Sequence, residues 1–191
     1  MSYFGNEYER RTLMNIEALY FQKYFYFKHL NQSSSEHSVT YWVKLSRDIE
    51  LHRLMYALLD VVQNQPVLRT QFVTDDFNQL KINLRDFFPF IEIQEVNEMS
   101  QSIDLEAFFT RNLNSYHFNQ LPLFNFKIYQ FLDGAYLLLD FHATIFNESQ
   151  LTPFLQQVNI AYTHSLKSEY SISDFYNWIK EMNQKMDQNQ A

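Results

Sequence analysis

Two apolar segments, residues 124–131 and 135–141, flank the dipeptide Asp133-Gly134 and predict a tight β-hairpin. Aspartate followed by glycine favours such a turn because both residues tolerate positive φ angles. The second segment contains Tyr136 and a run of leucines, so neither of its two faces is polar. A strand with two apolar faces is covered on both sides. We therefore expect residues 135–141 to lie centrally in a sheet.

The remaining segments alternate between the two-residue period of strands and the three-to-four-residue period of helices. Further strands are expected at residues 39–45, 67–73, 80–83 and 91–96, and a serine-rich loop at 31–38. Helices are expected at residues 13–27, 49–65, 104–113, 153–166 and 173–186, with Asp48 capping the second and Pro153, after Thr152, in the first position of the fourth. Helices interleaved with strands predict an α+β fold, a two-layer sandwich with a mixed β-sheet flanked by helices.

Length and composition fit a single domain covering residues 1–191. The chain has 191 residues, of which 46% are hydrophobic, enough for one core but too few for two ordinary domains. It has no cysteine, which removes disulfides and thiol chemistry and fits a reducing compartment, so we expect a cytoplasmic protein. A membrane span needs about 18 or more consecutive apolar residues. The chain has no such run, so we expect no contact with a membrane.

Composition also excludes several classes of functional site. Gly5 and Gly134 are the only glycines, so phosphate-binding loops, dinucleotide fingerprints and GxSxG hydrolases are excluded. The net charge is -7 and the basic residues are scattered, which argues against a nucleic-acid partner. No metal site is expected, because five of the six histidines show no spacing typical of metal ligands: His29, His37, His52, His117 and His164.

Four segments together carry a recognisable order of motifs. They are residues 41–72, which end in LRTQF; 117–131, HFNQLPLFNFKIYQF; 136–151, YLLLDFHATIFNESQL; and 173–182, SDFYNWIKEM. In this order they resemble the amino-terminal lobe of the condensation domains of nonribosomal peptide synthetases, which share the chloramphenicol acetyltransferase-like fold. The first is similar to the family's LRTxF strand, the second to the entry into its hairpin, and the last to its DYxxWQ segment.

The resemblance extends over about residues 13–182 and implies a single lobe, with the carboxy-terminal lobe absent. In the family, two lobes enclose the site where an aminoacyl group on one carrier protein attacks the thioester on another, in the biosynthesis of antibiotics and other secondary metabolites. The resemblance therefore implies peptidyl or aminoacyl carrier proteins, the missing lobe and neighbouring synthetase domains as partners. It implies no cofactor of the chain's own, since phosphopantetheine enters only on the carriers.

The family's HHxxxDG motif falls on the segment after the second hairpin strand. Its two histidines match His142 and Ala143, and its aspartate and glycine match Asn147 and Glu148. In the family, the second histidine positions or deprotonates the attacking amine, and the aspartate usually pairs with the arginine that corresponds to Arg69. A methyl group cannot take a proton, and the neutral Asn147 cannot give Arg69 a charge-assisted bond. The resemblance thus implies a degenerate active site.

Other alignments of this segment do not restore the motif. A shift by one residue makes His142 the second histidine, but it places Phe146 at the aspartate and Asn147 at the glycine. Heterocyclising relatives carry a two-aspartate pattern, and five residues after Asp140 this chain has Ile145. Neither alternative supplies the missing groups.

Each remaining polar candidate has a functional and a structural interpretation. His142 closes a buried strand, where a hydrogen-bonded packing role is favoured over catalysis. Arg69 could bind an anion, but on an interior strand a carboxylate or carbonyl partner is favoured. Glu148 could replace the lost base, but the helix dipole explains an acidic residue at a helix start. No residue is assigned as catalytic, and the apolar stripe of residues 175–186 either faces a partner or packs on the chain's own sheet.

Three functional hypotheses follow, and they leave enzymatic activity undecided. The first is the amino-terminal half of a condensation domain, inactive alone, whether excised from a longer protein or encoded short. The second is a non-catalytic module that docks a carrier or a partner enzyme. A less favoured third is a single-lobe acyltransferase that completes its site at a subunit interface.

Overall fold

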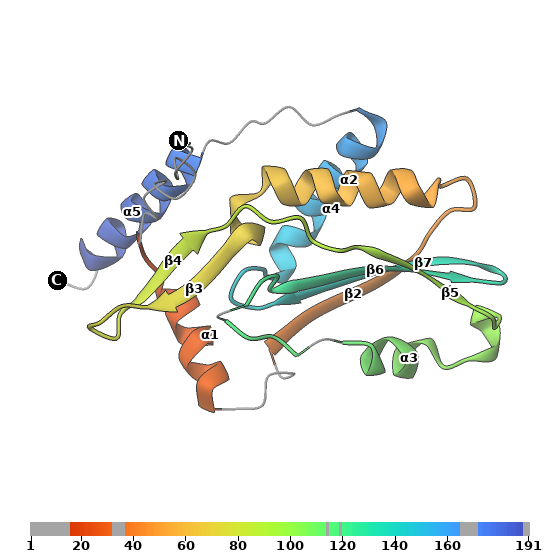
Figure 1. Ribbon diagram of the computed structural model, residues 1–191, viewed down its shortest axis with the longest axis horizontal. Coiled ribbons are helices and arrows are strands. Elements are labelled where there is room, and N and C mark those ends of the chain that lie inside the picture. Colours follow the sequence, from red (N-terminus) through yellow and green to blue (C-terminus); the bar gives the residue numbers. More distant parts are fainter. Residues whose placement is uncertain (1–15, 32–36, 114, 119, 165–171, 189–191) are drawn as a thin grey trace, which may run out of the picture.

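The computed structural model describes residues 16–31, 37–113, 115–118, 120–164 and 172–188, which form two β-sheets and their covering helices (Figure 1). The larger sheet has the order β2 (Ser38–Lys44), β7 (Gly134–His142), β6 (Phe124–Phe131) and β5 (Glu92–Val96). It is mixed, because β5 runs parallel to β6 while the other neighbours are antiparallel. The smaller sheet is antiparallel and has the order β1 (Ile16–Glu17), β4 (Leu80–Leu84) and β3 (Thr70–Thr74).

The predicted hairpin is confirmed, and its second strand lies inside the sheet. β7 pairs with β2 on one side and with β6 on the other. The turn is one residue earlier than predicted, because Gly134 already pairs with Phe131 and leaves Leu132 and Asp133 as the turn residues. Successive residues from Tyr136 to His142 are all buried, so both faces of β7 are covered, as its apolar sequence requires.

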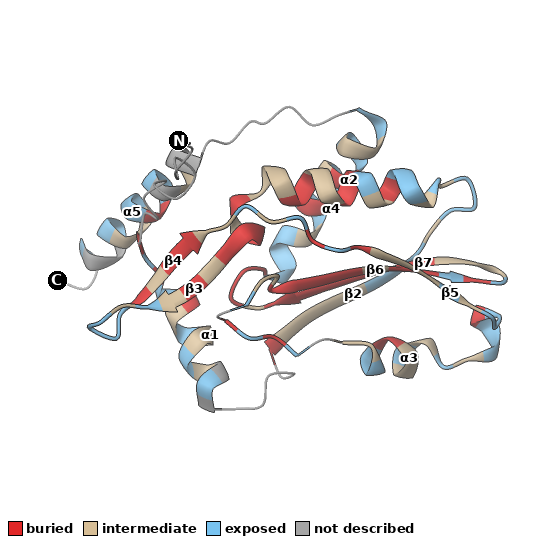
Figure 2. Ribbon diagram, viewed as in Figure 1, coloured by how far each residue is buried: buried red, intermediate tan, exposed pale blue. Residues whose placement is uncertain are grey.

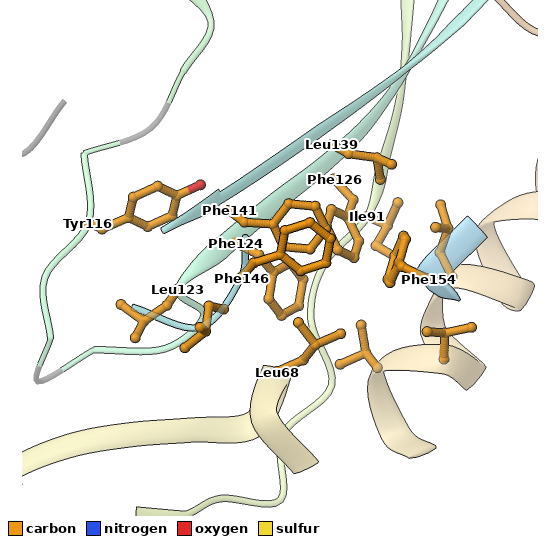
Figure 3. Close-up of a cluster of buried hydrophobic side chains, with 14 of the residues drawn as sticks. Leu68, Ile91, Tyr116, Leu123, Phe124, Phe126, Leu139, Phe141, Phe146 and Phe154 are labelled. Atoms are coloured by element: carbon orange, nitrogen blue, oxygen red, sulfur yellow. The ribbon is translucent and has the colours of Figure 1, made fainter. Parts of the chain in front are cut away.

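Helices cover both faces of the larger sheet. α2 (Leu51–Asn64) and α4 (Leu151–Thr163) lie on one face, and α3 (Leu105–Arg111) lies on the other near the hairpin turn (Figure 1). The main core, between the sheet and α2 and α4, is rich in phenylalanine, including Phe126, Phe141 and Phe154 (Figure 3). A smaller aromatic cluster, centred on Phe109 of α3, packs against the opposite face. Figure 2 shows that burial is concentrated along β6 and β7.

Several element boundaries differ from the sequence prediction. α1 (Tyr20–Asn31) begins later than residue 13, because Ile16 and Glu17 pair with β4; residues 13–15 lie outside the described part of the chain. The N-cap position of α2 is held by Glu50, not Asp48, because a turn from Ser46 to Ile49 precedes the helix; the Glu50 side chain makes no capping hydrogen bond.

Short 3-10 helices account for two further differences. η2 (Pro66–Arg69) precedes β3 and places Pro66 at a position where a missing N–H costs nothing, so the strand begins three residues later than predicted. η4 (Glu148–Gln150) precedes α4, so Pro153 is the third residue of α4 and not the first. A third, η3 (Ser100–Ser102), precedes α3, whose N-cap is Asp104.

The two carboxy-terminal stripes bury only part of their predicted faces. In α4, Phe154 and Val158 are buried, Leu155 is exposed, and residue 166 lies outside the described residues. In α5 (Ile172–Gln188), Ile179 is buried in the main core while Trp178 is 49% exposed. The stripe of α5 therefore packs on the chain itself through its centre. None of the described helices has the length and hydropathy needed to cross a bilayer.

The turn residue Asp133 gives the fold a defined response to acid. Its carboxylate accepts hydrogen bonds from the backbone N–H and the hydroxyl of Ser100, both at 2.7 Å, and these bonds lower the pKa of Asp133. The stabilisation is complete above the unfolded-state pKa of about 3.9 and is lost as the pH falls through the lower folded-state value. We expect the free energy of unfolding of Asp133→Asn to be lower than that of the wild type at pH 7. This difference in free energy should become smaller as the pH falls toward 3.

Urea unfolding followed by circular dichroism at several pH values measures this difference. Asp76→Asn is the matched control, because Asp76 is an exposed carboxylate in another turn. A difference between wild type and Asp133→Asn that stays constant from pH 7 to pH 3 would contradict the prediction.

Candidate functional site

His142 ends β7, and hydrogen bonds hold both its backbone and its ring. Its backbone N–H donates to the carbonyl of Leu123 at 2.9 Å, and the next residue, Ala143, donates to the carbonyl of His37 at 2.8 Å. The imidazole Nδ1 accepts from the backbone N–H of Thr144 at 3.1 Å and lies 2.7 Å from the Thr144 hydroxyl. A backbone N–H can only donate, so Nδ1 is an acceptor and the ring proton lies on Nε2.

Aromatic rings enclose the His142 side chain, which is fully buried. The ring of Phe118 stands edge-on to it with centroids 4.9 Å apart, and the rings of Tyr116 and His37 lie at 5.8 and 6.2 Å. Helix α1 supports this enclosure, since Tyr26 packs against Phe118. The His142 ring is therefore held by its contacts with Thr144 and by aromatic packing.

A buried carboxylate lies two residues before His142, on the same face of β7. Asp140 is fully buried, and its Oδ2 accepts from the hydroxyl of Tyr116 at 2.6 Å while its Oδ1 accepts from the hydroxyl of Thr40 at 3.0 Å. Burial, followed by the charge and hydrogen bond of Asp140, raises the pKa of Tyr116 far above its usual range. Tyr116 therefore remains a hydrogen-bond donor at all ordinary pH values.

Sequence reasoning missed this pair. The motifs in the sequence give Asp140 no role outside a two-aspartate pattern, and they give Tyr116 none. The available signal was an aspartate inside an otherwise apolar central strand, since a buried carboxylate requires donors from its neighbours. The sequence does not reveal that Tyr116, in the segment before β6, would be one of them.

Arg69 and Asn147 do not pair with one another. The Arg69 guanidinium Nη1 contacts Asp86 Oδ1 at 2.8 Å, with the side chain of Arg69 9% and that of Asp86 75% exposed. The expected carboxylate partner is thus present, but Arg69 ends η2 and does not lie on an interior strand. Asn147 instead caps η4, where its Oδ1 accepts from the Ser149 N–H at 3.0 Å and Gln150 completes a capping box.

Glu148 and Ala143 differ in their surroundings. Glu148 is the exposed first residue of η4, the position that the helix-start interpretation anticipated. Desolvation raises the pKa of Tyr41, and the charge of Glu148 adds to the effect. Ala143 is half-buried and presents only a methyl group between His142 and Thr144. Within the described residues, no cluster of three or more histidine, aspartate or glutamate side chains is arranged to hold a metal ion.

The chain matches a known family in sequence and several solved structures in fold. The family model for the condensation domain matches residues 15–191. The solved starter condensation domain of rhizomide synthetase RzmA superposes with a TM-score of 0.68 at 14% identity over 78% of this chain, and a variant in a "product-released" conformation with 0.75 at 14% over 88%. The tallysomycin biosynthesis protein TlmII gives 0.66 at 17% over 81%. No curated protein matches the chain in sequence.

The matches cover only part of each solved structure. This chain spans 37% and 41% of the two RzmA chains and 39% of the TlmII chain. At identities this low, the structural similarity shows the fold alone. That fold is a single lobe of mixed sheet flanked by helices. The predicted fold class is confirmed.

Proposed function

The chain belongs to the condensation domain family, and from this membership we propose that it is the amino-terminal half of a nonribosomal peptide synthetase condensation domain that has no activity alone. The parent enzyme would form amide bonds between aminoacyl or acyl groups held on the phosphopantetheine arms of carrier proteins. Its partners would be those carriers, the carboxy-terminal lobe and neighbouring synthetase domains. RzmA and TlmII belong to such biosynthetic systems, rhizomide and tallysomycin, which supports the proposal.

The reaction of the parent defines what this lobe lacks. The amine nitrogen of one carrier-bound aminoacyl group attacks the thioester carbonyl of the other, so a C–N bond forms and the C–S bond breaks. The carrier thiol leaves, and the amine gives up a proton that needs an acceptor placed within hydrogen-bond distance. The motif position for that acceptor is Ala143, whose methyl group has no lone pair.

The observation that carries the proposal is that the side chains of His142 and Arg69 already have partners within the chain. His142 is fully buried among aromatic rings, and its Nδ1 is already used by Thr144. Arg69 is paired with Asp86, so the partnership with the motif aspartate is replaced by another ion pair. The scaffold of the motif is kept while the groups that handle the proton are absent.

An assay with two loaded carrier proteins tests the proposal. We expect the full chain to yield no condensation product above the protein-free background in mass spectrometry, while an intact two-lobed condensation domain yields product under the same conditions. We expect Ala143→His to be inactive as well, because a lone lobe cannot close the site against water. A measurable turnover by the wild-type chain would overturn the proposal.

One observation favours docking without chemistry as a second candidate. Along α1, Tyr20, Tyr24 and Phe27 recur at helical spacing with exposed fractions of 61%, 55% and 50%. An apolar stripe of this kind is typical of an interaction surface. In the carrier experiment, saturable binding of a labelled carrier without product would support docking, and neither binding nor product would contradict it.

A further inference from the structure

A cavity of about 680 Å³ adjoins the motif segment: Asn147, at the motif's aspartate position, lines it, whereas His142 does not. Its walls come from the start of α1, the end of α2 with η2, the segment after β7, α4 and α5. Small-molecule sites in proteins have volumes of roughly 300–1,000 Å³. Apolar side chains, including Ile145, Phe175 and Trp178, provide most of its surface.

The polar lining of this cavity has a single chemical type. Among the described residues, no charged side chain, serine, threonine or tyrosine lines it. Its polar side chains are all carboxamides: Gln22, Asn64, Gln65, Asn147, Gln150 and Gln157. A carboxamide offers both donors and an acceptor, so its orientation decides what a ligand meets.

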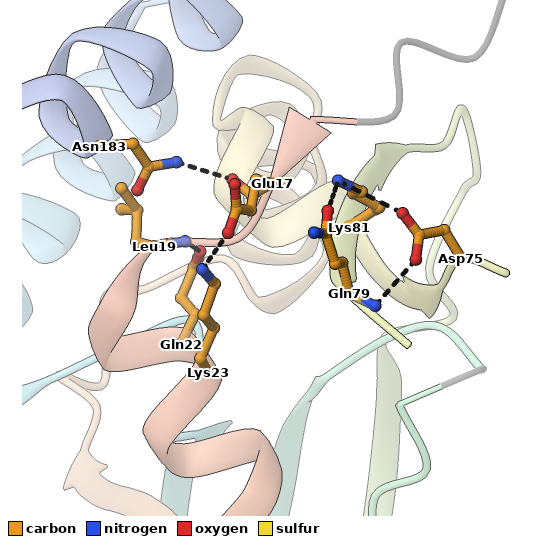
Figure 4. A network of polar contacts seen from close by, with 8 residues as sticks. All are labelled: Glu17, Leu19, Gln22, Lys23, Asp75, Gln79, Lys81 and Asn183. Atoms are coloured by element: carbon orange, nitrogen blue, oxygen red, sulfur yellow. Dashed lines mark hydrogen bonds and ion pairs between the residues drawn. The ribbon is translucent and has the colours of Figure 1, made fainter. Parts of the chain in front are cut away.

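Backbone hydrogen bonds fix the orientation of three of these carboxamides. Gln22 Oε1 accepts from the Leu19 N–H at 2.9 Å, as Figure 4 shows. Asn147 Oδ1 accepts from the Ser149 N–H at 3.0 Å, and Gln150 Oε1 accepts from the Asn147 N–H at 2.8 Å. Because a backbone N–H can only donate, each side chain turns its oxygen to the backbone and keeps its NH₂ group for other partners.

Gln22 shows this most clearly, because its side chain is 1% exposed. Its oxygen caps α1, and its Nε2 makes no hydrogen bond with any part of the chain that the structure describes. Because Gln22 lines the cavity, this NH₂ group is available to donate to a ligand oxygen there. The wall around it is anchored, since α5 is tied to β1 by the bond from Asn183 Nδ2 to the Glu17 carbonyl (Figure 4).

We propose that this cavity binds an uncharged small molecule with an apolar body and several acceptor oxygens, such as carbonyl, ester or amide oxygens. The NH₂ groups of Asn64 and Gln65 already donate to Asp60 and Gln157. The donors for a ligand are therefore the NH₂ groups of the other four carboxamides, and the apolar walls supply the burial. A carboxylate or phosphate would be desolvated there without a cation, in a chain whose net charge is -7. The inference does not depend on condensation activity, since it concerns binding alone.

Trp178 makes the proposal directly measurable. The chain has two tryptophans, and the other, Trp42, stacks on Phe109 with ring centroids 5.1 Å apart. In a Trp42→Phe background, Trp178 is the only tryptophan reporter. We expect N-acetyl-L-phenylalanine methyl ester to change its emission saturably. N-acetyl-L-phenylalanine, which is charged, and propylbenzene, which has no oxygen, should bind at least roughly tenfold more weakly.

Glutamate substitutions test the donors without removing the oxygens. Gln150→Glu and Gln157→Glu each keep one Oε1 acceptor and replace the NH₂ group by a second oxygen; a capping box accepts glutamate as well as glutamine. We expect each to weaken binding of the ester roughly tenfold. Gln156→Glu is the matched control, because it adds the same charge at an exposed position of α4 that does not line the cavity. It should leave binding within about twofold.

Several outcomes would overturn the proposal. They are no saturable response to the ester, equal responses to all three probes, or the same loss of binding in Gln156→Glu as in Gln150→Glu and Gln157→Glu. Circular dichroism of each variant verifies that the fold is kept, and the test does not use carrier proteins. Failure here therefore leaves the condensation-lobe proposal unaffected, and the reverse also holds.

Discussion

Replacing Phe141 with alanine is expected to lower the free energy of unfolding by about 3–5 kcal/mol. The Phe141 side chain is fully buried in the main core, on the face of β7 opposite His142. Its ring stacks on Phe146 with centroids 3.7 Å apart, and meets Phe126 and Phe154 edge-on at 5.1 and 5.4 Å (Figure 3). Truncation removes the buried ring and leaves a cavity that the rigid central strand cannot close.

Urea unfolding monitored by circular dichroism measures this loss. Phe88→Ala is the matched control, because the side chain of Phe88 is 85% exposed, and it should change the free energy of unfolding by less than about 0.5 kcal/mol. A loss below about 1 kcal/mol for Phe141→Ala, or equal losses for the two variants, would contradict the packing described here.

Replacing Tyr116 with phenylalanine is expected to cost about 1.5–3 kcal/mol, although only one oxygen atom is removed. That hydroxyl donates to Asp140 Oδ2 at 2.6 Å, and Asp140 is fully buried. Without the donor, the carboxyl group keeps the hydrogen bond from Thr40 but loses a charge-assisted one in a place that water does not reach.

The control for this variant is Tyr56→Phe. Tyr56 lies on α2 with an exposed fraction of 64%, so the loss of its hydroxyl should change the free energy of unfolding by less than about 0.5 kcal/mol. Equal effects of the two substitutions in urea unfolding would show that the buried hydrogen bond contributes nothing to stability.

Both predictions depend on β7, whose position follows from its sequence. The run of apolar residues after Gly134 predicted an interior strand, and β7 indeed lies between β2 and β6. Local hydrophobic period determines such features because it decides which faces must be buried. The resemblance carried by the order of the motifs is a separate signal, and the family membership and fold class that it implied are confirmed.

Elements whose ends depend on distant contacts were less predictable. The helical pattern at the start of the chain continues back to residue 13, but Ile16 pairs with Ile82 of β4, and a strand pairing cannot be read from the helix's own residues. Likewise, Arg69 was placed on a strand, whereas Pro66 begins a 3-10 helix that ends at Arg69. A long-range strand pairing decided the first boundary, and a local 3-10 helix decided the second.

The candidate site also has features that the sequence predicts and features that only the tertiary structure decides. From the sequence alone follow the central strand and the prediction that the segment after it carries the family's motif, with Ala143 aligned to a histidine. Only the tertiary structure decided that Arg69 pairs with Asp86, that Tyr116 serves Asp140, and that carboxamides from separate elements share one cavity. The physical reason is that hydrophobic period is a property of neighbours along the chain, whereas the partner of a buried polar group is whichever group the packed elements bring within about 3 Å.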